Sequence, residues 1–385
     1  MRVMISCGEP SGDLYAGALA GEILKLSPSS TITGFGGDRL AAAGARLIEN
    51  FSGLSVTGLI EVVRLLPRTY ATYKRLVADA DAVRPDVFVA IDFPDFNFTL
   101  ARALKKRGIP IVYYISPQLW AWRAGRMRTM QRVVDRVLVI FPFEEGIYQA
   151  AGVPVQWVGH PLLDVRPVPQ PRERFLSENG LDPTRPVLAL LPGSRTNELR
   201  EILPGLVDAA KRIRDSVTGL QFVVARAPHL RDELFEPLKA LDDTGARVVL
   251  VDGRADDVLA SADAAVVASG TVTVQGALHE CPMVVVYRLS PLTYTVGKPF
   301  VRVDTYAMAN LVAGRRVVPE LIQDEFTPLS VAREATRLLT DRSYAERMRA
   351  DLREVRSKLG TPGASRRAAE AVLAVAARGT VHPKG

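Results

Sequence analysis

A chain of 385 residues is too long for a single compact core and indicates two domains, each large enough to bury its own sheet. A hydrophobic content of 48% with well-mixed charges excludes a disordered chain, and no internal repeat indicates a solenoid. The net charge of +7 favours acidic partners such as phosphate ligands, nucleic acid or an anionic membrane surface. A solvated surface rich in arginine explains the charge equally well.

The cysteines and the N-terminus indicate the compartment. Cys7 and Cys281 stand in or beside apolar stretches and lack the spacing of a zinc site or a disulfide framework. The first apolar run ends at Gly8, which is too short for a signal peptide, and no later run has the length of a membrane span. We therefore expect a cytoplasmic protein without a structural metal.

Short apolar runs rich in β-branched residues alternate with segments of helical period. This pattern is typical of α/β domains in which helices cover both faces of a parallel sheet. A proline-rich passage between Pro161 and Pro171 is expected to link two Rossmann-like domains. Strands are predicted before it at 3–7, 31–34, 87–91, 111–115, 137–140 and 155–158, and after it at 187–191, 221–225, 248–251, 264–268 and 283–287.

The predicted domains span residues 1–165 and 175–343. Residues 344–385 are charged and helical in pattern, with a break at 360–363, and are expected to pack back across the first domain. Two Rossmann-like halves leave a cleft between them, and their ligands sit beyond the carboxyl ends of the strands. The chemistry is therefore sought in the loops that follow each strand.

The loop at residues 191–195 follows a predicted strand and leads into a helical segment. A glycine-containing turn before a helix points free N–H groups and the positive end of the helix dipole outward, which suits a phosphate. Arg195 would add a fork of donors, whereas a plain helix cap by Ser194 is the alternative. A second loop of this kind, Ser269 to Thr271, follows another strand. Together the two loops predict a site for a nucleotide diphosphate.

The loop at residues 8–13 joins the first strand to the first helix, where a doubly wound fold contacts its ligand. It lacks the dinucleotide-binding fingerprint, as does the glycine-rich segment 34–37, and the chain contains no P-loop sequence. NAD-dependent enzymes and P-loop nucleotidases are therefore poor fits.

Two carboxylates follow the strand 87–91 among aromatic residues. Desolvation there would raise the pKa of a carboxyl group and make it a better proton acceptor. Asp95 is expected to cap the next helix, and Asp92 is the predicted general base. His160 and the aromatic loop at 120–122 are weaker candidates, because a lone histidine and large aromatic side chains more often have structural roles.

The segment 58–66 is apolar on more sides than an ordinary surface helix needs. Basic residues follow it at Arg68, Lys74 and Arg75. This combination resembles an interfacial membrane helix, and a fully buried helix is the alternative. The apolar residues of the segment are Leu59, Ile60, Val62, Val63, Leu65 and Leu66.

Six motifs in order along nearly the whole chain resemble the lipid-A-disaccharide synthase family, inverting glycosyltransferases of the two-Rossmann-domain GT-B class. The motifs lie at residues 8–13, 92–97, 116–123, 190–195, 268–271 and 310–315. The resemblance implies transfer of a 2,3-diacylglucosamine unit from UDP to 2,3-diacylglucosamine 1-phosphate, which forms a β-1′,6 disaccharide and releases UDP. It implies no metal or other cofactor and no nucleic-acid partner. It does not indicate the oligomeric state.

The resemblance also assigns roles to residues. Asp92 would take the proton from the 6-hydroxyl of the acceptor, and Arg195 would stabilise the charge that grows on the departing diphosphate. The apolar segment, with Leu59, Ile60, Val62, Val63 and Leu66, would contact acyl chains at the cytoplasmic face of the inner membrane. Substrate contacts are expected from Gly8, Glu9, Ser11, Gly193, Ser194, Ser269, Gly270, Thr271, Gln275 and Asn310.

Gln275 departs from the family pattern, which usually has Glu at this position. In related enzymes that carboxylate accepts the ribose hydroxyls, whereas an amide keeps one acceptor and loses the charge. Three alternatives remain open: a UDP-sugar 2-epimerase with the same donor site, a GT-B transferase with a different acceptor, and a two-domain binding protein without catalysis.

Overall fold

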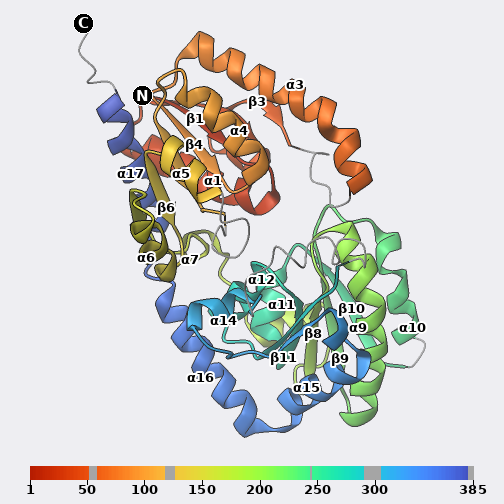
Figure 1. The fold of residues 1–385 in the computed structure, drawn as a ribbon. Helices are drawn as coiled ribbons and strands as arrows, with labels where there is room; N and C mark the ends of the chain where they lie inside the picture. Colours follow the sequence, from red (N-terminus) through yellow and green to blue (C-terminus); the bar gives the residue numbers. More distant parts are fainter. Residues whose placement is uncertain (52–58, 118–125, 243–244, 290–304, 380–385) are drawn as a thin grey trace, which may run out of the picture. The chain divides into compact units, whose positions relative to one another are not determined.

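The computed structural model describes residues 1–51, 59–117, 126–242, 245–289 and 305–379, with the side chains of 59–65 outside the description. The chain divides into two compact units, Met1–Val165 with Leu359–Gly385, and Arg166–Lys358. Each unit contains one parallel sheet with helices on both faces (Figure 1).

The first unit is built on a seven-stranded sheet in the order β3-β2-β1-β4-β5-β6-β7. The chain adds β2 and β3 on one side of β1 and then returns to add β4 on the other side. The strand order therefore reverses between β1 and β4, and this switch point is where such sheets bind ligands. The strands are β1 Arg2–Ser6, β2 Thr31–Gly36, β3 Arg46–Asn50, β4 Val87–Ile91, β5 Ile111–Tyr114, β6 Arg136–Val139 and β7 Val155–Trp157.

Helices of the first unit cover the two faces of this sheet. One face is covered by α3 Leu59–Val83, α4 Pro94–Lys105, α5 Met127–Val133 and α6 Pro142–Ala150, and the other by α1 Pro10–Leu26, α7 Leu162–Val165 and α17 Ala364–Gly379, with α2 Asp38–Ala42 beside α1. In α3 the buried residues Thr72, Leu76 and Ala80 recur every fourth position, which places one stripe of the helix against the core.

The second unit has a six-stranded sheet in the order β10-β9-β8-β11-β12-β13, whose switch point lies between β8 and β11. Its strands are β8 Val187–Leu191, β9 Gln221–Arg226, β10 Arg247–Asp252, β11 Ala264–Ala268, β12 Met283–Tyr287 and β13 Glu320–Ile322. All residues of β8 and β11 are buried, as expected for central strands of a sheet covered on both faces.

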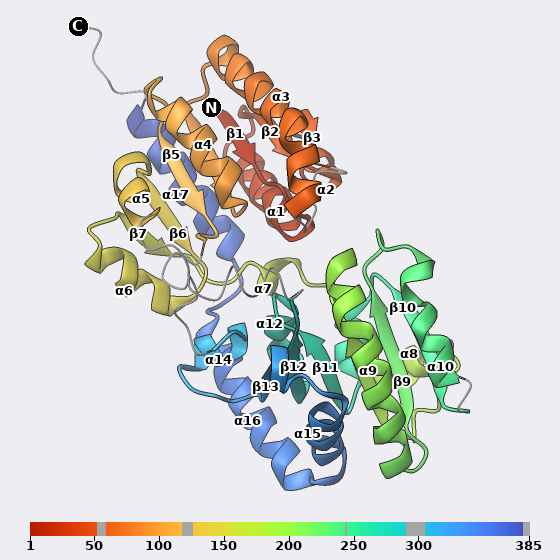
Figure 2. The same ribbon diagram turned by 45° about the vertical axis from the view of Figure 1, so that its right-hand side comes forward.

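Helices also cover both faces of the second sheet, and Figure 2 shows α9 along one of them. That face carries α9 Thr196–Ser216, α10 Lys239–Asp242, α15 Pro328–Thr340 and the 3-10 helix η2 Asp232–Leu238. The other face carries α8 Arg172–Glu178, α11 Ala255–Ser261, α12 Val272–Leu278, α14 Met308–Ala313 and α16 Arg342–Lys358, and a short 3-10 helix, η4 Gln323–Glu325, follows β13.

Every predicted strand is present within two residues of its predicted ends. The sequence did not reveal two edge strands, β3 and β13. β3 is half-buried and carries Arg46, Glu49 and Asn50, while β13 has three residues and begins with Glu320. Neither forms the apolar run by which the buried strands are recognised.

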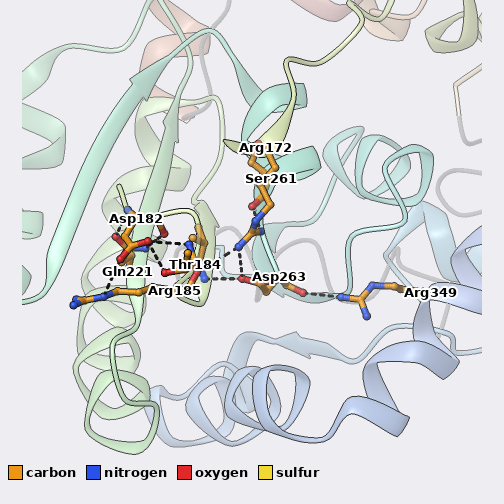
Figure 3. Close-up of polar contacts among 9 residues, drawn as sticks. Arg172, Asp182, Thr184, Arg185, Gln221, Ser261, Asp263 and Arg349 are labelled. Carbon is orange, nitrogen blue, oxygen red and sulfur yellow. Dashed lines mark hydrogen bonds and ion pairs between the residues drawn. The ribbon is translucent and has the colours of Figure 1, made fainter. Parts of the chain in front are cut away.

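The predicted C-terminal segment 344–385 divides between the two units, which corrects the expectation that it packs back as a whole. Helix α16 belongs to the second unit, where Arg349 donates to the carbonyl of Asp263 at 3.3 Å. The carboxylate of Asp263 also accepts Arg172 at 2.9 Å. The Arg349 bond attaches α16, and the Arg172 bond attaches α8, to the start of β11 at the amino-terminal edge of the sheet (Figure 3).

The same edge carries a second polar cluster (Figure 3). Gln221, the first residue of β9, accepts the N–H of Asp182 at 2.8 Å and donates to its carbonyl at 2.8 Å. Asp182 in turn accepts the hydroxyl of Thr184 at 2.7 Å. Because ligands of parallel sheets bind at the opposite edge, we assign these clusters a structural role.

Only α17 returns to the first unit, where Asp164 caps its start. The carboxylate of Asp164 accepts the N–H groups of Gly363 at 2.5 Å and Ser365 at 2.7 Å. Arg367, one turn further on, donates to the carbonyl of Val158 at 2.8 Å. A carboxylate on free N–H groups at a helix start stabilises both the helix and its attachment.

Candidate functional site

The loops that follow β1 and β4 meet at the switch point of the first sheet. A Cβ atom at Gly8 would lie 2.4 Å from the ring of Phe93, so only glycine fits there. Asp92 and Phe93 have φ values of 44° and 46°, a left-handed conformation that costs about 1–2 kcal/mol per non-glycine residue. Glu9 and Ser11 stand at the start of α1, directly after Gly8. The predicted base therefore lies on a strained turn beside the β1–α1 loop.

The side chain of Asn97 holds this turn from inside the protein. Its Nδ2 donates to the carbonyls of Ser6 and Ile91, both at 3.2 Å, and of Asp92 at 2.8 Å, while its Oδ1 accepts the Ser6 hydroxyl at 2.7 Å. The hydroxyl of Tyr113 donates to the same Asp92 carbonyl at 2.8 Å. Burial raises the pKa of Tyr113 well above its usual value, so this hydroxyl keeps its proton. Sequence reasoning missed the anchoring role of Asn97.

The two carboxylates of the 92–97 motif have different surroundings. Asp95 lies inside the first turn of α4, and the N-cap position belongs to Phe93, which corrects the predicted cap. The Asp95 side chain is 78% exposed and forms an ion pair with Arg126. Asp92 is half-buried at the carboxyl end of β4, where the switch point is. The structure thus leaves Asp92 as the better-placed proton acceptor of the two.

Asp13, the last residue of the 8–13 motif, has a structural task. Its buried carboxylate accepts the N–H groups of Gly37 at 2.7 Å, Arg39 at 2.9 Å and Leu40 at 3.2 Å. It therefore caps α2 from α1, across the loops that follow β1 and β2. A Cβ atom at Gly37 would lie 2.7 Å from an Asp13 oxygen, which explains the glycine.

The loop after β8 already holds an anion of the protein. Glu198 accepts the N–H of Ser194 at 3.1 Å and pairs with Arg195 at 2.9 Å. Gly193 has a φ of 125°, and a Cβ atom there would lie 2.7 Å from the Glu198 carboxylate. His229 contacts the carbonyl of Ser194 at 2.8 Å. The donors expected to bind phosphate are therefore arranged around a carboxylate. The sequence could have indicated this arrangement, because Glu198 stands in the first turn of the predicted helix.

The loop after β11 stands beside β8 at the same switch point. The N–H of Ser269 donates to the carbonyl of Val286 at 2.9 Å, and its hydroxyl donates to the carbonyl of Tyr306 at 3.1 Å. Gly270 has a φ of 153°, and Thr271 is exposed at the start of α12. The loop is thus braced by Ser269 and presents Thr271.

Two further predicted contact residues have their amides engaged within the protein. Gln275, one turn after the β11 loop, donates to Asp256 at 3.1 Å. The buried Asn310 donates to the carbonyl of Val318 at 2.9 Å and to Glu320 at 2.6 Å, and its Oδ1 accepts two backbone N–H groups at 2.7 and 2.9 Å. These four bonds use the whole capacity of an amide. Asn310 therefore braces the segment before β13, contrary to the expected substrate contact.

His160 is buried in the first unit and packs against the rings of Tyr15 and Phe141. Its Nδ1 accepts the N–H of Leu162 at 3.2 Å. Burial lowers the pKa of His160 to about 3, so the ring is neutral at physiological pH. This environment gives His160 a structural role rather than that of an acid or base.

Residues 59–66 of the apolar segment form the start of α3, and their side chains up to residue 65 lie outside the described residues, as do residue 58 and the aromatic loop 120–122. Within the described part, Leu66 and Tyr70 are 55% and 58% exposed. Lys74 lies 4.8 Å from the centre of the Tyr70 ring. Among the helices that the structure describes, none is long and apolar enough to span a membrane. The described side chains also include no cluster of three His, Cys, Asp or Glu residues that suits a metal ion.

The model of the lipid-A-disaccharide synthetase family matches residues 3–375. The chain belongs to this family. The lipid-A-disaccharide synthase of Geobacter metallireducens is 45% identical over 375 residues, which cover 97% of this chain and 96% of the relative. That of Myxococcus xanthus is 44% identical over 380 residues, which cover 99% of both chains. The resemblance predicted from the six motifs is confirmed.

Solved structures of low identity share the fold. A putative UDP-N-acetylglucosamine 2-epimerase from Listeria monocytogenes has a TM-score of 0.64 at 16% identity, covering 97% of this chain and 96% of its own. The calicheamicin glycosyltransferase CalG4 has a TM-score of 0.60 at 18% identity, covering 99% of both. These likenesses confirm the two Rossmann-like domains of the GT-B class. The relatives near 45% identity make the chain a glycosyltransferase of the synthase family and disfavour the epimerase alternative.

Replacing Asn97 by Ala should lower the free energy of unfolding by about 2–4 kcal/mol, because the carbonyls of Ser6 and Ile91 lose the amide donor and the buried Ser6 hydroxyl loses its acceptor. Thr99→Ala is the matched control on the same helix, since its exposed hydroxyl bonds only the Asp95 carbonyl. Urea denaturation measures both. Equal stability of the two variants would show that Asn97 is no anchor.

The depressed pKa of His160 predicts a pH-dependent stability. Between the pKa of an unfolded histidine, about 6.5, and the folded value of about 3, unfolding takes up one proton. The free energy of unfolding therefore falls by about 1.4 kcal/mol per pH unit as the pH drops through this window, and the full contribution is present only above it. In the variant His160→Gln, the free energy of unfolding should depend less steeply on pH, by about 1.4 kcal/mol per pH unit, in urea denaturation between about pH 6 and pH 5. An unchanged slope would mean that His160 titrates normally.

Proposed function

We propose that this chain transfers 2,3-diacylglucosamine from UDP to the 6-hydroxyl of 2,3-diacylglucosamine 1-phosphate. The products are lipid A disaccharide 1-phosphate and UDP. The observation that carries the proposal is the family match over residues 3–375, which spans the loops at both switch points. Each unit then supplies one half of the chemistry.

The second unit is proposed to bind the UDP part of the donor. Ser194 and Arg195 supply an N–H and a guanidinium to the diphosphate, which displaces the Glu198 carboxylate from them. Thr271 completes the contact with the diphosphate. Gly193 and Gly270 let the backbone of the two loops come close to it. Arg195 stabilises the negative charge that develops on the departing diphosphate. The support is that these donors already hold an anion, the carboxylate of Glu198.

The first unit is proposed to bind the acceptor, with contacts from Gly8, Glu9 and Ser11. The carboxylate of Asp92 takes the proton of the 6-hydroxyl as that oxygen attacks the anomeric carbon from the face opposite UDP. The new carbon–oxygen bond forms, the bond to the diphosphate breaks, and UDP leaves with the electron pair. The transfer needs no metal ion or other cofactor, because Arg195 supplies the positive charge and Asp92 the base.

The start of α3 is proposed to contact the cytoplasmic face of the inner membrane, where both acylated substrates reside. Leu66 and Tyr70 are exposed, and Lys74 beside Tyr70 suits an anionic surface. The apolar residues Leu59, Ile60, Val62 and Val63 precede them in the same helix.

The direct test supplies the purified protein with both acylated sugars in detergent and reads the products by mass spectrometry. The proposal expects a disaccharide 1-phosphate and UDP. A folded protein that binds UDP but forms no disaccharide would refute it, and a sugar nucleotide epimerised at C2 would restore the epimerase alternative.

Asp92→Asn should cut turnover by roughly two to four orders of magnitude, because the amide cannot take the proton. UDP affinity, measured by calorimetry, should stay unchanged. Asp95→Asn is the matched control, since its carboxylate is exposed and paired with Arg126. Full activity of the Asp92 variant would place the base elsewhere, with Glu9 the next candidate.

Leu66→Ser combined with Tyr70→Ser should reduce binding to vesicles of anionic phospholipid, because it removes exposed apolar surface at the start of α3. Leu329→Ser is the control, because Leu329 is an even more exposed leucine on α15 in the second unit. Cosedimentation of each variant with vesicles gives the bound fraction. Equal binding of both variants would discard the role of α3.

A further inference from the structure

A nearly buried carboxylate, Asp256, bridges Gln275 of α12 and His279, the residue that follows this helix. It lies in the first turn of α11, and its Oδ2 accepts Nε2 of Gln275 at 3.1 Å. Its Oδ1 contacts Nε2 of His279 at 2.7 Å. The side chains of Asp256 and His279 are only 11% and 4% exposed. Gln275 and His279 are four residues apart, so they share one face of α12.

The chemistry of a carboxylate fixes how its two partners are oriented. An ionised carboxylate only accepts hydrogen bonds, so Gln275 must turn its NH₂ group toward Asp256, and Nε2 of His279 must carry the hydrogen. Because the amide is planar, the carbonyl oxygen of Gln275 then faces away from Asp256. A glutamine without this partner has two orientations of similar energy, one of which presents a donor in place of the acceptor.

Gln275 is placed where the nucleotide site is proposed. It lies one turn beyond the loop after β11, and its N–H donates to the Thr271 carbonyl at 3.2 Å. Its side chain is half-buried, whereas Asp256 behind it is buried. One end of the amide is therefore held by a buried carboxylate, in the helix that follows the loop after β11.

We propose that Asp256, itself held by His279, is a positioning residue that fixes the carbonyl oxygen of Gln275 as an acceptor for a ribose hydroxyl of UDP. This inference rests on the proposed UDP site in the second unit. It explains how an uncharged side chain serves at position 275, because the carboxylate of Asp256 lies behind the amide and orients it. A Glu at this position would bring a second carboxylate to the place where the Gln275 amide now lies 3.1 Å from Asp256, and the two like charges would repel each other.

Calorimetry on the full chain with UDP and with its 2′-deoxy and 3′-deoxy analogues tests the inference. The wild type should bind UDP more tightly than at least one analogue. Asp256→Asn should reduce that ratio about five- to tenfold, the effect of one hydrogen bond, because an Asn no longer selects the amide orientation. His279→Gln, which frees the other side of Asp256, should shift the ratio in the same direction and provides a second variant if the first does not fold.

Asp257→Asn is the matched control. It is the neighbouring carboxylate and contacts Gln170 and Arg254 instead, so the ratio should stay at the wild-type value. Gln275→Glu should weaken UDP binding at neutral pH, and Asp256→Asn in that background should restore it, because the double variant no longer opposes two carboxylates. Recovery in the double variant supports the pairing.

The outcomes separate the inference from the function on which it rests. A wild type that does not bind UDP overturns both. Folded Asp256 and His279 variants that bind UDP with an unchanged ratio overturn the inference alone, because a purely structural role would weaken UDP and its analogues equally.

Discussion

The buried amide of Asn97 is the constraint on which the turn after β4 in the first unit depends. It joins the end of β1 to the end of β4 and holds the backbone of Asp92 in a conformation that the residue would not adopt alone. Several buried hydrogen bonds of about 1 kcal/mol each offset the strain of two left-handed residues. The contact between Gly8 and the Phe93 ring locks the same turn from the other loop.

In both units, carboxylates hold the residues that follow the strands. In each unit a buried or half-buried carboxylate on a helix orders residues that follow a strand: Asp13 caps α2 in the first unit, and Glu198 and Asp256 bind Arg195 and Gln275 in the second. The first unit carries the proposed proton acceptor, Asp92, on a turn that Asn97 holds. The second carries the N–H group of Ser194 and the guanidinium of Arg195. In the proposed mechanism, the base and the group that stabilises the departing diphosphate belong to separate sheets.

The sequence predicts the buried strands and the loops after them, because an unbroken apolar run followed by glycine and polar residues leaves few alternatives. It does not predict β3 or β13, whose edge positions tolerate polar residues. Nor does it show that the Asn310 amide is fully hydrogen-bonded within the protein, or that Asp256 contacts Gln275. Both sets of contacts arise only when the elements pack together. The helical period of residues 344–385 likewise predicts helices without indicating which sheet each one covers. Glu198 is an exception, because its place in the first turn of a helix could have been recognised.

The proposed reaction is a single displacement, in which Asp92 deprotonates the acceptor while UDP leaves from the opposite face of the sugar. The anomeric configuration of the product tests this most directly, because one displacement inverts the configuration of the donor and two restore it. Proton NMR of the purified disaccharide should show a β-linkage formed from an α-linked UDP-sugar. An α-linked product would mean retention of configuration, which a single attack from the face opposite UDP cannot give, and would contradict the role given to Asp92.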